Sequence, residues 1–285
     1  MAMSVGDRVR IAIETECSSI KAGNVHPHAS FHDLTHEHFM VAAKAIGRAV
    51  DEHAEESVGQ MVLRSVKAMM DSAETNTSLG TILLMAPLAV AAKRLGIEEC
   101  GFTQVLQSQV REVLAALVPA DSAAIYEAIR IAKPGGLGDS KSMDVRESAP
   151  ESILDAMRTA AEWDDIALQY VSDFELVFSL SQRMKTKEFS AGQSKLDTIR
   201  CLQMELLSER VDSLIARKNG LGFASEVKKR AGEVIAAGVF GSDEYERAWH
   251  AFDLFLRDEG HRGNPGTIAD LIAAALFVAG FARIQ

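Results

Sequence analysis

The sequence contains few cysteines and none in close pairs: Cys17, Cys100 and Cys201 lie far apart. This spacing argues against a disulfide framework and a cysteine-rich zinc site, and it fits a reducing cytoplasm. Positive charge is also scarce, because 30 Lys and Arg stand against 40 Asp and Glu, for a formal net charge of −10. Binding of nucleic acid requires clustered cations to neutralise phosphates, so we expect no nucleic-acid partner.

Long apolar segments are absent as well. The two most apolar stretches, Leu79–Ala92 and Leu271–Ala282, are shorter than the ~20 residues that cross a bilayer. They are typical of helices buried on all sides, and charges such as Asp7 and Arg8 interrupt the N-terminal segment where a signal core would lie. We therefore expect a cytoplasmic protein without a membrane partner that acts on small-molecule substrates. The sequence leaves a homodimer open.

Helical patterning, by contrast, is abundant. Apolar residues recur every three or four positions, as in Val110, Val113 and Leu117, and convincing strand patterns are missing. No linker or repeat divides the 285 residues, of which 47% are hydrophobic. We predict an all-α fold, one multi-helix bundle over residues 1–285 with a buried apolar C-terminal helix. The expected helices cover about 5–20, 36–56, 58–74, 79–95, 102–117, 120–132, 150–162, 164–184, 194–218, 221–237, 243–258 and 267–282.

Short polar segments at the expected helix ends are the candidates for chemistry, because free backbone N–H groups there favour anions. In Lys21–Pro27, a lysine beside a Gly-Asn turn suits a phosphate, although an ordinary loop with Asn24 in the left-handed conformation is the alternative. In Glu74–Thr81, hydroxyls and an amide crowd the start of an apolar helix. Ser78 could be its N-cap, but a cap does not require the whole cluster.

Four further segments have both a functional and a structural interpretation. The glycine-rich Pro134–Asp139 segment permits close backbone approach or simply connects helices, and Asp165 with Gln169 shares one helix face. Asp212 precedes Arg217 and Lys218 by about one turn, near an expected helix C-terminus whose dipole would favour the two cations. Thr267 and Asp270 fit a capping box, yet Asp270 is also well placed to hold a metal or a ribose hydroxyl.

Five histidines between residues 26 and 38 resemble a metal cluster. Their spacing fits no standard zinc pattern, and nearby acidic residues are limited to Asp33 and Glu37. We favour a solvated loop that enters a helix near Thr35. The histidines are His26, His28, His32, His36 and His38.

Taken together and in this order, the polar segments resemble the triphosphoribosyl-dephospho-CoA synthase family, as a divergent branch of it. The resemblance runs from about residue 16 to residue 271. Its pieces are Glu16, Lys21, Gly23–Val25, Phe31–Asp33, Asn76–Thr81, Asp144–Val145, Asp165–Ala167 with Gln169–Tyr170, Asp212–Ile215, Asn264–Thr267 and Ala269–Leu271.

The resemblance implies an all-α enzyme that moves the triphosphoribosyl group of ATP to the 2′-hydroxyl of 3′-dephospho-CoA and releases adenine, with Mg²⁺ as cofactor. It implies cations and magnesium on the triphosphate, a carboxylate base, and a group that assists the departing adenine. The expected phosphate and nucleotide ligands are Lys21, Asn24, Asn76, Thr77, Arg217, Lys218 and Asn264, and the expected magnesium ligands are Glu16, Asp33 and Asp165. Asp212 is the first candidate for the base and Asp270 the second.

The sequence also departs from the family pattern. Ala22 stands where the family usually has proline, and Ser78 where relatives often have asparagine. Two alternatives therefore stay open: a related ATP-dependent transferase with another acceptor in cofactor biosynthesis, and a non-catalytic nucleotide-binding protein of the same fold.

Overall fold

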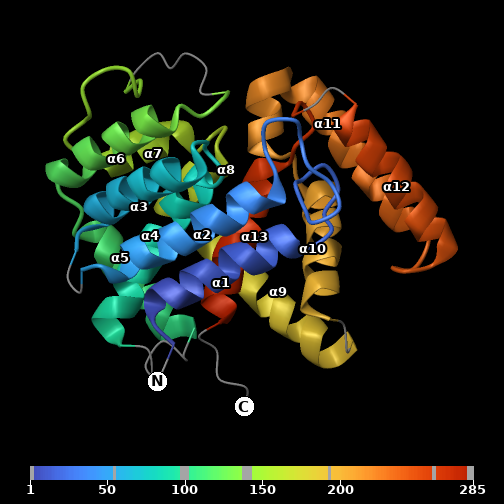
Figure 1. Ribbon diagram of the computed structural model, residues 1–285, viewed down its shortest axis with the longest axis horizontal. Helices are drawn as coiled ribbons and strands as arrows, with labels where there is room; N and C mark the ends of the chain where they lie inside the picture. The colour runs from blue at the N-terminus through green and yellow to red at the C-terminus, as the bar shows by residue number, and fades with distance from the viewer. Residues whose placement is uncertain are drawn as a thin grey trace.

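The computed structural model describes residues 3–53, 56–96, 103–136, 143–191, 194–258 and 261–280. Over these residues the chain forms helices and no β-strand, which confirms the predicted all-α class. The helices, labelled in Figure 1, are α1 (Val5–Ser18), α2 (His36–Asp51), α3 (Val58–Ala73), α4 (Leu79–Leu95), α5 (Thr103–Ala115), α6 (Pro119–Ala132), α7 (Ile153–Ala160), α8 (Asp165–Val171), α9 (Glu175–Ala191), α10 (Lys195–Glu209), α11 (Ser213–Ala237), α12 (Asp243–Arg257) and α13 (Gly266–Ala279).

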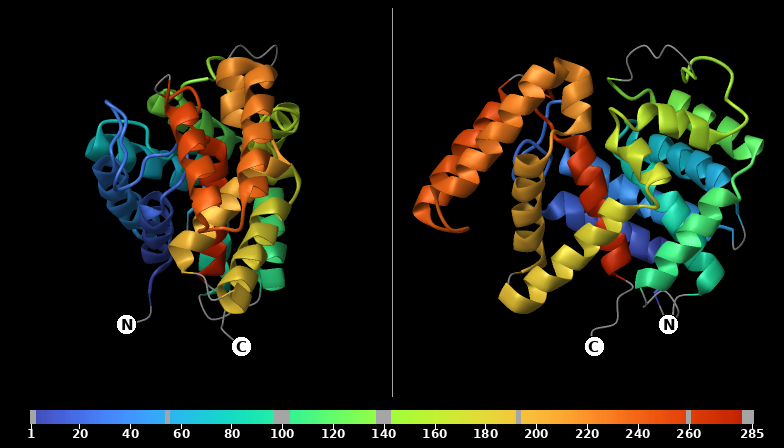
Figure 2. Two further views of the ribbon diagram at one scale, coloured as in Figure 1. Left: turned by 90° about the vertical axis from the view of Figure 1, so that its right-hand side faces the viewer. Right: turned by 180° about the vertical axis from the view of Figure 1, so that it is seen from behind.

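The C-terminal helix α13 runs through the middle of the molecule, as both views of Figure 2 show. It packs against α1 and α4 from the N-terminal half of the sequence and against α9, α10 and α11 from the C-terminal half. Ile268 through Val278 are almost entirely buried apart from Ala269 and Asp270, and the stretch from Leu271 to Val278 contains only apolar residues. This confirms the predicted buried apolar helix and supports a single domain.

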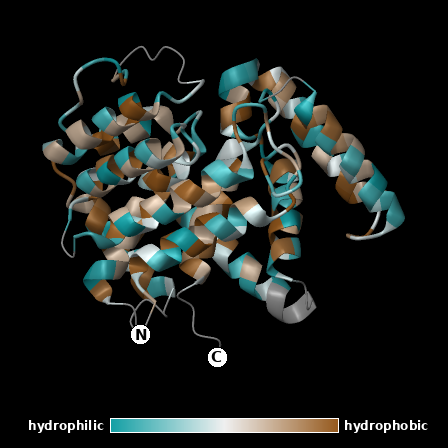
Figure 3. Cartoon of the chain, in the orientation of Figure 1, coloured by the Kyte–Doolittle hydropathy of each residue, from teal (hydrophilic) through white to brown (hydrophobic). Residues whose placement is uncertain are grey.

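The surrounding helices cover this centre with one apolar face each. Hydrophobic and hydrophilic bands lie side by side on α2, α3 and α12, which is the pattern of helices that pack on one face (Figure 3). The α11–α12 pair extends away from the body of the bundle (Figure 1). None of the helices in the described part of the chain is long and apolar enough to span a membrane.

Two of the predicted helices are interrupted. The helix predicted over 164–184 is broken between α8 and α9, where Asp173 and Phe174 adopt left-handed backbone angles (φ 52° and 60°) and Phe174 becomes fully buried. The helix predicted over 194–218 is broken at Arg210, which is extended (φ −144°, ψ 158°). Asp212 then caps a new helix, so Arg217 and Lys218 lie in the first turns of α11, shortly before its non-helical residue Gly220.

The break predicted at Gly220–Gly222 is a kink within α11. Gly220 has φ 83° and ψ 161°, backbone angles that residues other than glycine rarely adopt. Helical structure continues on both sides of it.

Candidate active site

A cavity of about 920 Å³ lies where the N-terminal ends of α4, α11 and α13 meet the loop between α1 and α2. Helices α6, α7 and α8 contribute the remaining, mainly apolar wall. The volume lies within the usual range for small-ligand and cofactor pockets. Most of the site residues predicted from the sequence line this one cavity: Glu16, Asn24, Asp33, Asn76, Thr77, Arg217, Lys218, Asn264 and Asp270.

Asp270 is the best-placed carboxylate of the cavity. It lies on the first turns of α13, and its Oδ1 accepts a 2.5 Å hydrogen bond from the hydroxyl of Thr81 on α4. The other oxygen, Oδ2, lies so close to Gly80 that a Cβ there would be 2.1 Å away. Burial raises the pKa of Asp270 to about 8, the Thr81 hydrogen bond opposes this, and the negative charge of Glu16 adds to it.

This arrangement replaces the predicted capping box of α13. The helix begins at Gly266, and the Thr267 hydroxyl accepts a hydrogen bond of 3.0 Å from Ser213. Asp270 is therefore free of a capping role and presents its carboxylate to the cavity wall. Gly80 and Thr81 were not among the predicted site residues, although both lie in the Asn76–Thr81 motif. Their contact with Asp270 crosses 189 residues of sequence, which no local pattern indicates.

Glu16 on α1 is a second buried carboxylate on the cavity wall. Its Oε1 lies 3.0 Å from the ammonium of Lys21, and the two side chains form a buried ion pair. Burial raises the pKa of Glu16, and the charge of Lys21 opposes that shift.

Lys21 lies behind the wall and does not line the cavity. It is fully buried, and its ammonium donates to the carbonyl oxygens of Glu16 (2.6 Å) and Ser19 (3.2 Å). In this position Lys21 neutralises Glu16 and closes the turn after α1, and its contact with phosphate stays a prediction.

Asp212 also lies outside the cavity lining. It is buried as the N-cap of α11, where Oδ1 accepts from Ile215 N (3.0 Å) and Oδ2 accepts from Ile268 N at the start of α13 (2.8 Å). Burial raises its pKa to about 6, against the two backbone hydrogen bonds. Both oxygens have structural partners, so the geometry favours a capping role over the predicted role as base.

Asp165, a predicted magnesium ligand, is likewise absent from the cavity wall. It pairs with Arg210 at 3.3 Å, and burial raises its pKa while Arg210 opposes the shift. Its neighbour Asp164 lines the cavity, caps α8 through Ile166 N (2.8 Å) and forms an ion pair with Arg217.

Basic side chains gather along another part of the lining. Arg217 and Lys218 were predicted, and the structure adds Lys133 at the end of α6 and Arg146, which pairs with Asp144 at 2.7 Å. Burial lowers the pKa of Lys218, opposed by the charge of Asp212. Lys133 and Arg146 escaped prediction because each lies in a segment without any phosphate-binding pattern.

The turn after α1 is held in place by a residue that the sequence did not indicate. Gln203 on α10 is fully buried, accepts from Ala22 N (2.8 Å) and donates to Ala22 O and to Asn24 Oδ1 (2.8 Å each). Asn24 in turn donates to Asn264 Oδ1 at 2.7 Å, so two predicted ligands meet across the chain. The N–H of Ala22 is the donor that a proline at this position would lack.

The start of α4 combines capping with exposure to the cavity. Asn76 Oδ1 accepts from Leu79 N at 3.1 Å, and Thr77 accepts a 3.0 Å hydrogen bond from the Ser78 hydroxyl. Ser78 is the N-cap residue, as considered from the sequence, but its side chain forms no capping hydrogen bond. Asn76 supplies that hydrogen bond in its place, and the remaining polar atoms border the cavity.

The five histidines do not form one cluster. The Nδ1 of His26 accepts from His28 N (3.3 Å), His38 belongs to the capping box of α2, and His36 lies 3.3 Å from the Ser18 hydroxyl. Burial lowers the pKa of His26 to about 4, which keeps it neutral. Of the five, only His32 groups with other metal-ligand side chains among the described residues.

The glycine-rich segment is described only in part. Gly135 lines the cavity, and a Cβ at Gly136 would lie 2.8 Å from Lys218 Cγ, so the segment approaches the base of the lysine side chain. Pro134 also lines the cavity, and residues 137–139 of the motif lie outside the described part of the chain.

Comparison with known proteins gives the fold and the family of the chain. No curated protein matches the chain. A crystal structure of a candidate triphosphoribosyl-dephospho-CoA synthase from Archaeoglobus fulgidus superposes with a TM-score of 0.62 at 24% sequence identity, and it covers 86% of this chain and 99% of its own. That similarity shows the fold.

The sequence model of the ATP:dephospho-CoA triphosphoribosyl transferases matches residues 2–285, which is nearly the whole chain. The matched length includes every segment that contributes to the cavity. The chain therefore belongs to the ATP:dephospho-CoA triphosphoribosyl transferase family.

Proposed function

We propose that this chain transfers the triphosphoribosyl group of ATP to the 2′-hydroxyl of 3′-dephospho-CoA, releasing adenine, inside the cavity between α1, α4, α8, α11 and α13. The observation that carries the proposal is the composition of that cavity. It combines the buried Glu16 and the half-buried Asp270 with basic side chains and a largely apolar wall, and it lies in a chain of the matching family.

The reaction exchanges one bond at C1′ of the ribose for another. The bond from C1′ to N9 of adenine breaks, and a bond from C1′ to the acceptor oxygen forms. The acceptor hydroxyl loses a proton, and adenine takes one up on leaving. The transition state should be oxocarbenium-like, as in glycosidases, so a nearby carboxylate stabilises it and removes the acceptor proton.

Asp270 is our candidate for that base. It lines the cavity, and its raised pKa of about 8 lies close to working pH, which suits a group that must gain and lose a proton in one cycle. The Thr81 hydroxyl fixes one oxygen, and Gly80 leaves room for the other. Asp212 caps two helices and lies outside the lining, so it ranks second in our account.

Glu16 is our candidate for the magnesium that accompanies ATP. Glu16 lines the cavity, and the charge repulsion between Glu16 and Asp270 fits a site that a divalent cation joins. When bound, magnesium neutralises charge on the triphosphate. Further positive charge comes from four basic residues of the lining, Arg217, Lys218, Lys133 and Arg146. Hydrogen bonds to ribose and base come from Asn24, Asn264, Asn76 and Thr77.

Product analysis tests the proposal. Purified protein is incubated with ATP, MgCl₂ and 3′-dephospho-CoA, and the mixture is resolved by liquid chromatography with mass detection. We expect adenine and triphosphoribosyl-dephospho-CoA in equal amounts. Release of ADP, AMP or pyrophosphate without adenine would rule out transfer at C1′. Adenine release only with another acceptor, such as a pterin, would support the alternative transferase.

A further inference from the structure

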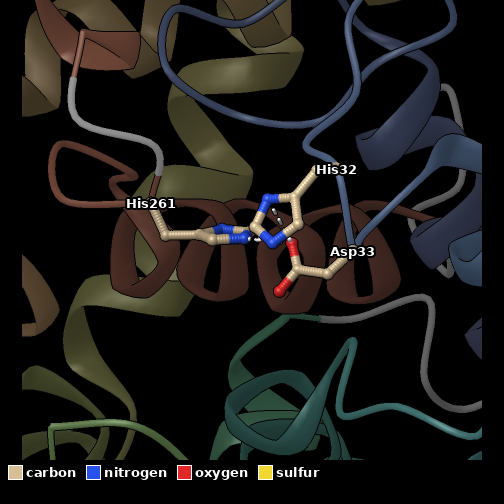
Figure 4. A group of neighbouring side chains, drawn as sticks. All are labelled: His32, Asp33 and His261. Atoms are coloured by element: carbon tan, nitrogen blue, oxygen red, sulfur yellow. Dashed lines mark hydrogen bonds and ion pairs between the residues drawn. The ribbon is translucent and has the colours of Figure 1, made fainter.

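His32, Asp33 and His261 meet at the edge of the cavity, although they come from distant parts of the chain. His32 and Asp33 lie in the loop between α1 and α2, and His261 lies in the segment before α13 (Figure 4). The Nε2 of His261 is 2.5 Å from Asp33 Oδ1, and His32 Nδ1 is 3.5 Å from the same oxygen. One ligand atom from each of the three residues lies within 4.8 Å of the other two.

We propose that His32, Asp33 and His261 bind a divalent transition-metal ion, of the zinc or cobalt class. Two imidazole nitrogens and a carboxylate oxygen are the donor set of three-ligand sites that leave one coordination position open. Two imidazoles also distinguish this site from a magnesium site, because Mg²⁺ prefers oxygen ligands and retains water.

The spacing of the three side chains suits an ion after a small rearrangement. Metal–ligand bonds of about 2.0–2.2 Å place the ligand atoms of one tetrahedral ion about 3.3–3.6 Å apart. In the structure the three ligand atoms lie within 4.8 Å of one another. The 2.5 Å between Asp33 Oδ1 and His261 Nε2 is shorter than the distance between two ligand atoms on one ion. His32, whose side chain is 84% exposed, can rotate inward, while the Asp33 carboxylate and His261 separate around the ion.

Packing holds the side chain of His261, the least exposed of the three proposed ligands, in one orientation. The ring of His261 packs on buried Phe31, with centroids 4.0 Å apart, and its side chain is only 27% exposed. The guanidinium of Arg257 lies 5.6 Å from the Phe31 ring centroid and braces it. A packed aromatic support of this kind holds a ligating imidazole in one direction and reduces the entropy lost on binding an ion.

The position of the site gives the ion access to ligands in the cavity. Asp33 and His261 both line the cavity, so the ion would sit at its edge with an open position available to an oxygen ligand such as a phosphate. The metal proposal does not depend on the transferase reaction, because binding of the ion is measured without nucleotide or acceptor.

Titration of tag-free, EDTA-treated protein with Co²⁺, followed by visible absorption and equilibrium dialysis, tests the site. We expect one Co²⁺ per chain with the intense visible bands of a four-coordinate nitrogen- and oxygen-ligated ion, displaced by equimolar Zn²⁺ and not by equimolar Mg²⁺. His32→Ala, Asp33→Asn and His261→Ala should each weaken binding about tenfold or more. His250→Ala, an exposed histidine on α12, is the matched control and should bind as wild type does.

His32→Ala keeps the test decisive even if the variant of the packed His261 folds poorly, because His32 is exposed and its removal leaves no cavity. Absence of stoichiometric Co²⁺ binding by the folded wild type would overturn the proposal. Unchanged binding in His32→Ala or His261→Ala would also overturn it, because the ion would then lie elsewhere in the chain.

Discussion

At the residue scale, Asp270 combines three properties that the proposed base needs. It lies in the cavity, it is oriented by Thr81, and its pKa is raised to about 8, mainly by burial. Asp270→Asn keeps the size and the acceptor oxygen for Thr81 but removes the base. We expect the rate of adenine release to fall by about 10²- to 10⁴-fold, measured in single turnovers with saturating ATP and dephospho-CoA. A loss of less than a few-fold would assign the base elsewhere.

The raised pKa of Asp270 also makes the free energy of unfolding depend on pH. The pKa of Asp270 in the folded state, about 8, lies above its ordinary value of 3.8, so the folded chain holds a proton that the unfolded chain has released. Stability contributed by this group is complete below pH 3.8 and is lost as the pH rises through 8. Asp270→Asn should therefore gain stability relative to wild type between pH 5 and about 9. Thermal unfolding of both proteins across this range measures the difference, and a constant gap would contradict the raised pKa.

Asp212 allows a direct comparison with Asp270. Because its carboxylate accepts from Ile215 N and Ile268 N, Asp212→Ala removes the cap of α11 and a support of α13. We expect a loss of about 1–3 kcal/mol in the free energy of unfolding, measured by denaturant titration. Asp212→Asn, which keeps one acceptor, should retain adenine release within a few-fold. A fall of about 10²-fold or more in folded Asp212→Asn would restore its predicted role as base.

The local patterns of the sequence indicated several of the residues that line the cavity but not their partners. Asn76, Asn264 and Asp270 were predicted from short motifs, and all three line the cavity. The contact between His261 and Asp33 joins residues 228 positions apart, and His261 lies in a segment that reads as a break between helices. A single sequence contains no signal for such a pairing.

At the scale of elements, α10 holds the turn after α1 through one side chain. Gln203→Leu would preserve volume but leave the N–H and C=O of buried Ala22 and the Oδ1 of Asn24 without partners. Each unsatisfied buried group costs about 1–3 kcal/mol, so we expect a clear fall in the urea midpoint. Gln182→Leu, on the exposed face of α9, is the control and should change stability by less than about 0.5 kcal/mol. Equal midpoints for the two variants would show that the turn needs no support from α10.

Helix positions followed from apolar periodicity, whereas two helix breaks did not. The periodic pattern continues through Asp173 and through Arg210, so it predicted unbroken helices there. The breaks arise because Phe174 turns into the core and because Asp212 caps a new helix against α13. Tertiary packing decides both, and packing is not visible in local spacing.

At the scale of the whole molecule, the cavity depends on helices from both halves of the chain packed around α13. A ligand that binds only this assembled cavity should stabilise the entire fold. We expect ATP with Mg²⁺ at 100 times its dissociation constant to raise the free energy of unfolding by about 2.7 kcal/mol, measured by thermal or urea unfolding. Glu16→Gln should reduce the part of this gain that requires Mg²⁺. No shift with saturating nucleotide would favour a helical protein that binds a partner and no ATP.

The most direct test of the central claim is a crystal structure of Asp270→Asn bound to ATP, Mg²⁺ and dephospho-CoA, because the variant should trap the substrates unreacted. Our account predicts the triphosphate beside Glu16, Arg217 and Lys218, with C1′ of the ribose facing residue 270 and the acceptor hydroxyl. Nucleotide bound outside this cavity, or bound within it with the γ-phosphorus facing residue 270, would contradict the account.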